Sequence, residues 1–216
     1  MNDSLVTIVG SSYFEPISLL LERLDKYDNA NSNEVQAGYK INGFASAICI
    51  LAVVCLESYV MRVRYINNAT QNEIDKVPVP VYLKKLYQDF PFEDDLFEIH
   101  ILRDALVHNH LWEVSYSCDD ETAMILQSVN KRSSGDTKYQ RYVDTETNLT
   151  KKLRLSVSPI KVGKSDAISV LQTMWKILIF LEKKNTRQCY VSHLRAVHKG
   201  ERRRFGEILG MPETCT

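Results

Sequence analysis

The longest apolar run in the chain, GFASAICILAVVCL, covers residues 43–56 and ends at Glu57. Its length of about 14 residues falls short of the roughly 20 that a membrane-spanning helix needs. The helical pattern continues on both sides, over residues 37–67. A helix that is apolar on nearly every side belongs in the centre of a bundle. We therefore expect a buried central helix at 37–67 and no contact of the chain with a membrane.

Four further stretches repeat apolar residues at helical spacing and predict helices around this centre. They are residues 13–28, 81–90, 94–112 and 165–184, the last with Ser165 as its expected N-cap. The VPVP segment at 77–80 separates the central helix from the next one, because proline lacks a donor and restrains its predecessor. Residues 13–112 and 164–184 thus predict a helical bundle within one mainly α domain, residues 1–216.

The pattern changes between residues 113 and 160. Short β-branched or alternating stretches appear there, separated by turn-like CDDE and KRSSGDTK. The stretches are WEVSYS at 112–117, AMILQSV at 123–129, YQRYVDT at 139–145 and LRLSVSPI at 153–160. They predict a small antiparallel β meander, or a pair of hairpins, inserted into the bundle.

The C-terminal part, residues 185–216, predicts a basic and irregular tail with at most a short helix around 190–198. The chain as a whole carries no net charge, yet residues 183–204 contain eight basic residues and one acid, Glu201. Basic side chains beside aromatic ones can hold single-stranded RNA. The residues expected to do so are Lys199, Arg202, Arg203 and Arg204, near Tyr190 and Phe205. A solvated tail, or one that contacts a second subunit, remains the alternative.

The five cysteines are odd in number and form no CxxC pair. This pattern is typical of reduced thiols in a cytosolic protein rather than of a disulfide framework. The N-terminal residues do not predict a signal peptide, because no basic segment precedes a long apolar one. We therefore expect a cytoplasmic protein.

The segment LRDALVHNHLWEV at 102–114 places an arginine, an aspartate and two histidines in an apolar frame. Residues four apart lie about 40° apart around a helix, so Asp104 and His108 share a face. A carboxylate one turn before a histidine can fix its tautomer and favour its charged form. The guanidinium of Arg103 fits phosphate, and an arginine with a histidine suffices to cleave RNA, whose 2′-hydroxyl is the nucleophile. The alternative is a local ion pair on an exposed helix.

Other chemistry in this region is less favoured by the residue pattern. His108 and His110 lie about 200° apart on a helix, which does not suit a shared metal. His193 and His198 lie in a basic stretch, where a cation is disfavoured. We therefore expect neither a metal nor a cofactor. Glu57 is interpreted as a helix-end charge, or as a partner of Arg103 within the bundle.

RDALVH at 103–108 resembles the R-x(4–6)-H signature of HEPN-domain ribonucleases, which fold as antiparallel bundles of four or five helices. The resemblance implies that residues 13–112 and 164–184 form such an antiparallel, HEPN-like bundle. The resemblance implies that Arg103 contacts the scissile phosphate, that His108 is the acid–base group, and that Asp104 sets their geometry. His110 fits the six-residue spacing and would replace or assist His108. Where related toxins often carry His-x-Tyr, this chain has His110 in the tyrosine position, so a modified-tyrosine switch is not implied.

The resemblance also implies a biological role. Such domains work as homodimers whose motifs face each other across one cleft, without metal, and many are toxins or antiviral defence effectors. An antitoxin or a defence-system protein is then an expected partner, beside RNA. The alternative from another class is an inactive HEPN-like module that binds RNA or a partner protein without cutting.

Overall fold

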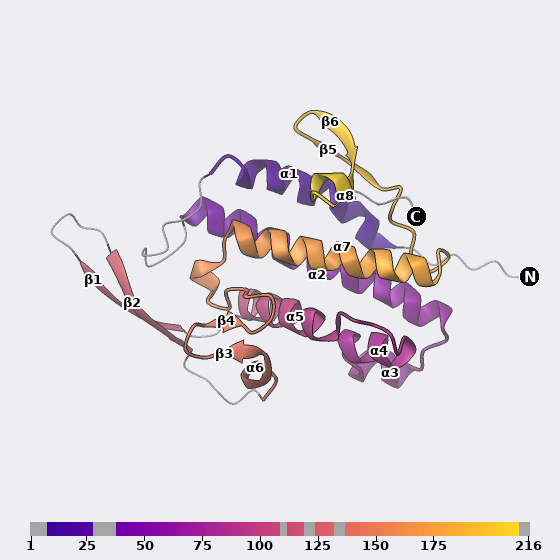
Figure 1. Ribbon diagram of the computed structural model, residues 1–216, viewed down its shortest axis with the longest axis horizontal. Coiled ribbons are helices and arrows are strands. Elements are labelled where there is room, and N and C mark those ends of the chain that lie inside the picture. Colours follow the sequence, from indigo (N-terminus) through magenta and orange to yellow (C-terminus); the bar gives the residue numbers. More distant parts are fainter. Residues whose placement is uncertain (1–7, 28–37, 109–111, 119–123, 132–136, 212–216) are drawn as a thin grey trace, which may run out of the picture.

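The computed structural model describes residues 8–27, 38–108, 112–118, 124–131 and 137–211, and its centre is one long helix, α2 (Tyr39–Ile66) (Figure 1). This confirms the helix expected at 37–67. Its buried side chains contact η1 (Val9–Tyr13), α1 (Phe14–Leu24), α5 (Glu93–Val107) and α7 (Lys164–Lys184). Among the described residues, α2 is the one helix long and apolar enough to cross a membrane by length and composition, and half of its most apolar window is buried inside the protein.

The expected helices are present, but α1, α4 (Val79–Leu86) and α5 end earlier than the pattern indicated. Helix α1 stops at Leu24 and α5 at Val107, while α4 begins within the VPVP segment, with Pro80 in its first turn. The sequence reasoning missed α3 (Gln71–Lys76). This short helix starts with a capping box in which Thr70 and Glu73 bond each other's backbone N–H, a local signal visible in TQNE.

The pair α2 and α7 departs from a purely antiparallel bundle. Near the start of α2, Asn42 Nδ2 donates to the carbonyl oxygens of Pro159 and Val162, just before α7, at 2.6 and 3.1 Å. Near the end of α2, Arg62 Nη2 donates to the Arg187 carbonyl, just after α7, at 3.0 Å. The two helices therefore run in the same direction, whereas α1 and α5 run the opposite way (Figure 1).

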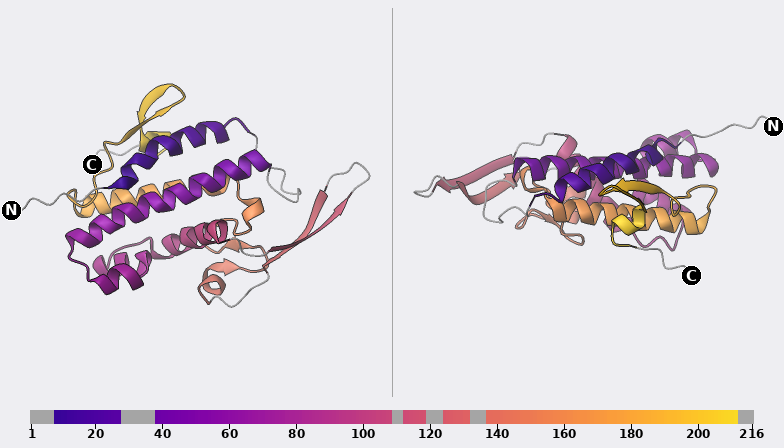
Figure 2. Two further views of the ribbon diagram at one scale, coloured as in Figure 1. Left: turned by 180° about the vertical axis from the view of Figure 1, so that it is seen from behind. Right: turned by 90° about the horizontal axis from the view of Figure 1, so that it is seen from above.

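The β1–β2 hairpin, Trp112–Cys118 paired with Met124–Lys131, confirms the first part of the predicted insertion. It extends from the bundle as an arm (Figure 2). The strand expected at 139–145 is confirmed only at Val143–Asp144, which form β3, and is wrong over 139–142, because residues Thr137–Tyr142 form helix α6. Tyr139 and Tyr142, three apart and both buried, pack with Ile101 of α5, and this tertiary contact outweighs the β propensity of the segment.

After α6 the insertion contains only short elements, β3 (Val143–Asp144), β4 (Leu149–Thr150) and η2 (Pro159–Lys161). Two buried carboxylates hold this stretch. Glu98 accepts the backbone N–H groups of Lys152 and Leu153, and Asp166 accepts those of Ser156 and Gly163, all within 2.9 Å. The N-cap of α7 is therefore Gly163 with Asp166 as the capping side chain, and the expectation of Ser165 was wrong.

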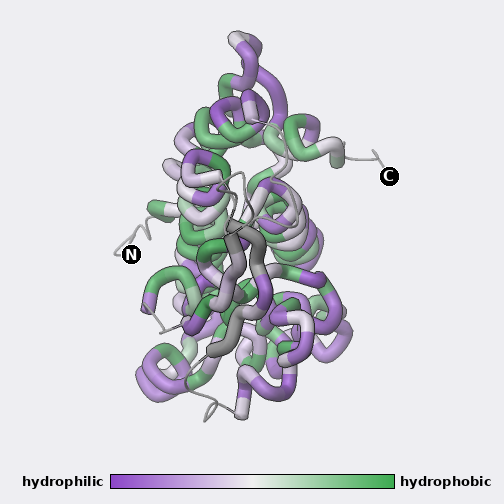
Figure 3. Tube along the Cα trace, turned by 90° about the vertical axis from the view of Figure 1, so that its left-hand side faces the viewer, coloured by the Kyte–Doolittle hydropathy of each residue, from purple (hydrophilic) through white to green (hydrophobic). Residues whose placement is uncertain are grey.

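The expected irregular tail is instead a folded part of the protein. Strands β5 (Arg195–His198) and β6 (Glu201–Arg204) form a hairpin on α1, so the helix expected around 190–198 is wrong, and α8 (Phe205–Ile208) follows. The ring of Phe205 is buried, with its centroid 4.6 Å from that of Phe14 and 5.6 Å from that of Trp175. Residues 189–209 thus contribute to the core, although the hairpin itself is strongly hydrophilic (top of Figure 3).

Candidate functional site

Arg103 lies near the C-terminal end of α5, where this helix crosses the middle of α2. Its Nη2 is 3.0 Å from Glu57 Oε1 of α2, and its Nε is 3.2 Å from Oδ1 of its neighbour Asp104. Nη2 donates a hydrogen bond to Glu57, whereas Nε has no hydrogen-bond partner among the described residues, so the contact with Asp104 is an ion pair alone. The side chain is 25% exposed, and the guanidinium therefore still reaches the surface. The pairing of Glu57 with Arg103, one of two interpretations of Glu57, is therefore observed.

The remaining motif residues lie at the end of the same helix. His108 is the C-cap of α5, and its backbone N–H donates to the Asp104 carbonyl at 3.0 Å. Its side chain is exposed. The second carboxylate oxygen of Asp104 lies 3.8 Å from Lys138 Nζ of α6. His110 lies outside the described residues.

His100, one turn before Arg103 on α5, joins this cluster from the buried side. Its Nδ1 is 3.7 Å from Glu57 Oε1, too long for a hydrogen bond, and its Nε2 has no hydrogen-bond partner among the described residues. Burial, aided by the charges of Arg103 and Lys138, lowers the pKa of His100 to about 3. The imidazole is therefore neutral near pH 7.

Glu57 faces groups of both signs. Burial raises the pKa of its carboxyl group, the charge of Asp104 adds to this, and the cations Arg103 and Arg64 oppose it. A partly buried carboxylate needs a partner for its charge. The pairing of Glu57 with the permanent cation Arg103 therefore keeps the guanidinium in one position. Glu57 thus orients the Arg103 fork from a different helix.

The residue pattern missed two members of this cluster, His100 and Lys138. His100 could have been found, because a residue three positions before Arg103 shares its helix face. Lys138 could not, since it fell at the end of the turn expected at KRSSGDTK and its contact with α5 is tertiary. Within the part of the chain that the structure describes, no group of three or more His, Cys, Asp or Glu side chains is placed to hold a metal ion.

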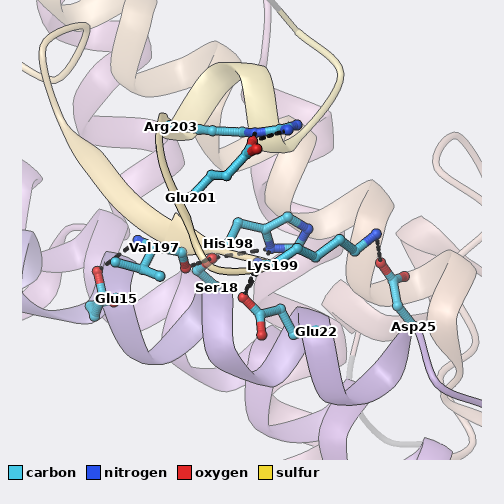
Figure 4. Close-up of polar contacts among 9 residues, drawn as sticks. All are labelled: Glu15, Ser18, Glu22, Asp25, Val197, His198, Lys199, Glu201 and Arg203. Carbon is cyan, nitrogen blue, oxygen red and sulfur yellow. Dashed lines mark hydrogen bonds and ion pairs between the residues drawn. The ribbon is translucent and has the colours of Figure 1, made fainter.

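The four basic residues expected to bind RNA lie elsewhere, on the β5–β6 hairpin beyond α1. Figure 4 shows that two of them are neutralised within the chain: Lys199 Nζ lies 3.1 Å from Asp25, and Arg203 Nε donates to Glu201 at 2.9 Å. Arg202 and Arg204 are exposed. The expectation that Phe205 lies beside them as an available aromatic ring is wrong, because its ring is buried in the core.

The fold separates these two predicted regions. Helix α2 lies between α5, which carries Arg103, and α1, which carries the hairpin (Figure 1). Comparison of the chain with protein-family models, with curated proteins and with solved structures gives no significant match.

Proposed function

We propose that this chain is a HEPN-type, metal-independent endoribonuclease whose site is the C-terminal end of α5. The observation that carries the proposal is the guanidinium of Arg103, held by Glu57 and Asp104 and partly exposed, five residues before an exposed histidine. An oriented arginine fork binds a phosphodiester and stabilises the charge that develops on it. The resemblance of RDALVH to the HEPN signature supports the same assignment.

The proposed reaction needs one base, one acid and one cation. The base removes the proton from the 2′-hydroxyl, the 2′-oxygen attacks phosphorus, and the 5′-oxygen leaves with a proton from the acid. The products are a 2′,3′-cyclic phosphate and a 5′-hydroxyl. Arg103 is assigned to the phosphate, His108 to proton transfer, with His110 as its assistant or substitute, and Glu57 to the position of Arg103.

The same proposal includes the setting in which the enzyme works. A homodimer would bring the two exposed α5 ends together across one cleft, so that one chain supplies the acid and the other the base. We propose a cytoplasmic toxin or antiviral defence effector, without a cofactor and away from membranes. An antitoxin or a defence-system protein would restrain it.

A second candidate is an inactive HEPN-like module that binds RNA or a partner protein. The observation in its favour is that, among the described residues, both ion pairs of Arg103 are with acids of its own chain. A phosphate would have to compete with these carboxylates for the guanidinium.

Cleavage of RNA in EDTA distinguishes the two candidates. We expect the wild type to produce 2′,3′-cyclic phosphate ends, and Arg103→Ala and His108→Ala each to lower the rate by about 10²-fold or more. Arg103→Lys should not restore the rate, because an ammonium lacks the planar fork. Product ends are read by labelling before and after phosphatase treatment.

The matched control is Arg23→Ala, which removes an exposed arginine from α1 and should leave cleavage unchanged. His110→Ala, measured beside His108→Ala, assigns the proton-transfer role to one histidine. A folded wild type that cuts no transfer, messenger or ribosomal RNA would reject the enzyme and favour the binding module.

A further inference from the structure

The outward face of the β5–β6 hairpin carries three arginines from two strands. Along β5, Arg195 and Val197 are exposed while Ala196 and His198 are buried. Residues directly opposite in an antiparallel pair point to the same side. Arg204 pairs with Arg195 and Arg202 with Val197, so these arginines surround Val197 on the solvent side. We call Arg195, Arg202 and Arg204 the arginine face.

This arrangement places like charges together. Arg195 and Arg204 are directly opposite, and such pairs destabilise a sheet. No ion pair joins an arginine of this face to any described residue, whereas the other basic residues of the hairpin, Lys199 and Arg203, each have one. Two carboxylates lie beside this face, because Glu15 and Glu207 accept the backbone N–H groups of Val197 and Arg204 at 3.1 and 3.2 Å. They offset part of the charge of the three guanidinium groups, so the face keeps a small excess of positive charge.

The hairpin is held rigidly in place beneath this face. Figure 4 shows the contacts with α1: Ser18 Oγ donates to the Val197 carbonyl at 2.7 Å, and Glu22 accepts the backbone N–H of Lys199. The strands join through Lys199 and Gly200, which both have positive φ, 53° and 80°, as a tight two-residue hairpin turn requires. Charges on a fixed platform bind a ligand at a smaller cost in entropy.

We propose that the arginine face binds the phosphates of single-stranded RNA as a contact separate from the cleavage site. Guanidinium groups match phosphate oxygens in pairs. Arg202 and Arg204 are two residues apart on a strand, about 7 Å, which is comparable with the separation of successive phosphates along a nucleic-acid strand. Tyr190, 53% exposed and stacked on His193 in the segment leading into β5, offers a ring to a base.

The choice of RNA as ligand rests on the proposed function, whereas the excess charge of the face does not. Because α2 lies between the hairpin and Arg103, one protomer cannot hold a short RNA at both places. The face therefore acts on RNA long enough to pass around the bundle, or on RNA cut by a second copy. It raises affinity for long RNA and leaves the reaction itself unchanged.

The test measures how tightly the full chain binds a 2′-O-methyl RNA of about 20 nucleotides, with fluorescence anisotropy as the readout. This RNA cannot be cleaved, because its 2′-oxygen is blocked. Arg202→Ala with Arg204→Ala should weaken binding about tenfold and reduce the slope of log affinity against log salt by about 1.4, the equivalent of two phosphate contacts. Arg203→Ala, which removes the same charge from the paired, opposite side of the hairpin, should change affinity less than about twofold.

Binding of the same variants to vesicles containing phosphatidylserine is measured in parallel. Three results would overturn the proposal. They are unchanged RNA affinity and salt slope in the folded double variant, an equal loss of RNA affinity in Arg203→Ala, or a double variant that binds RNA normally and binds only the vesicles more weakly. Cleavage of a trinucleotide, too short to reach the hairpin, is measured in the same variants. If the wild type binds RNA through this face and cuts no RNA, the proposed ribonuclease activity is rejected and the proposed RNA-binding face is retained. A double variant that cuts the trinucleotide normally and binds long RNA weakly supports both.

Discussion

Two polar clusters join elements of this fold, and each contains a buried histidine near a glutamate. At the junction of α2 and α5, His100 lies 3.7 Å from Glu57; at the junction of α1 and β5, His198 lies 3.9 Å from Glu22. Their partners differ. Glu22 accepts a backbone N–H of the hairpin, whereas the recorded contacts of Glu57 are with the side chains of Arg103 and His100.

This difference separates a structural cluster from a candidate functional one. Glu15, Ser18 and Glu22 of α1 each bond to the β5–β6 backbone, so these contacts fix the hairpin on the helix. A bond between two side chains can be exchanged for a bond to a ligand without loss of secondary structure. The α2–α5 junction also keeps His100 Nε2 without a hydrogen-bond partner among the described residues, a cost that structural clusters normally avoid.

The largest expected effect tests whether the α1–hairpin junction is part of the core. Phe205→Ala removes a fully buried ring packed between Phe14 and Trp175. We expect the free energy of unfolding to fall by about 3–5 kcal/mol, as for other large-to-small core substitutions. Urea denaturation followed by circular dichroism measures it. A loss below about 1 kcal/mol would mean that the C-terminal segment is an appendage after all.

A matched pair of substitutions compares the two glutamates directly. Glu57→Gln keeps the shape of the side chain and removes the charge that orients Arg103, so RNA cleavage should fall by about 10²-fold through misplacement of the fork. Glu22→Gln makes the same change at the other junction and should leave the cleavage rate unchanged.

The measured quantities are kcat and KM, with circular dichroism as the check on folding. Loss of the Arg103 position should lower kcat/KM in Glu57→Gln at unchanged thermal stability. Equal rates for Glu57→Gln and wild type would remove Glu57 from the mechanism. A parallel loss in Glu22→Gln would show that the two clusters do not differ in the way proposed.

The smallest effect concerns acid stability. The pKa of His100 is about 3 in the folded protein, below the ordinary value of about 6.5, so between these values the unfolded state binds more protons. Stability contributed by neutral His100 is therefore present above pH 6.5 and is lost as the pH falls, by at most about 1.4 kcal/mol per pH unit. Wild type should lose stability between pH 6.5 and 4.5 more steeply than His100→Gln, in parallel urea titrations. Identical slopes would show that His100 protonates in the folded state.

Local patterns in the sequence predicted most of the helices. The apolar run at 43–56 predicts a central helix, and the i, i+3, i+4 repeats define the surrounding helices, because helix periodicity is a short-range property. The first hairpin and the motif RDALVH were visible for the same reason. The apolar positions within the basic C-terminal stretch, Cys189, Val191, Ala196 and Phe205, were a signal for a folded segment that the charge count obscured.

Only the tertiary structure decided which residues meet. Tyr139 and Tyr142 form a helix rather than a strand because α5 offers Ile101 and Phe97 to pack against. Arg103 meets Glu57, 46 residues away in sequence, because α2 and α5 cross at that point. The basic residues at 199–204 separate into paired and unpaired ones because β5 and β6 pair in one register. Spacing along the chain determines periodicity, whereas the charge that a side chain presents to a ligand depends on the partner that folding brings beside it.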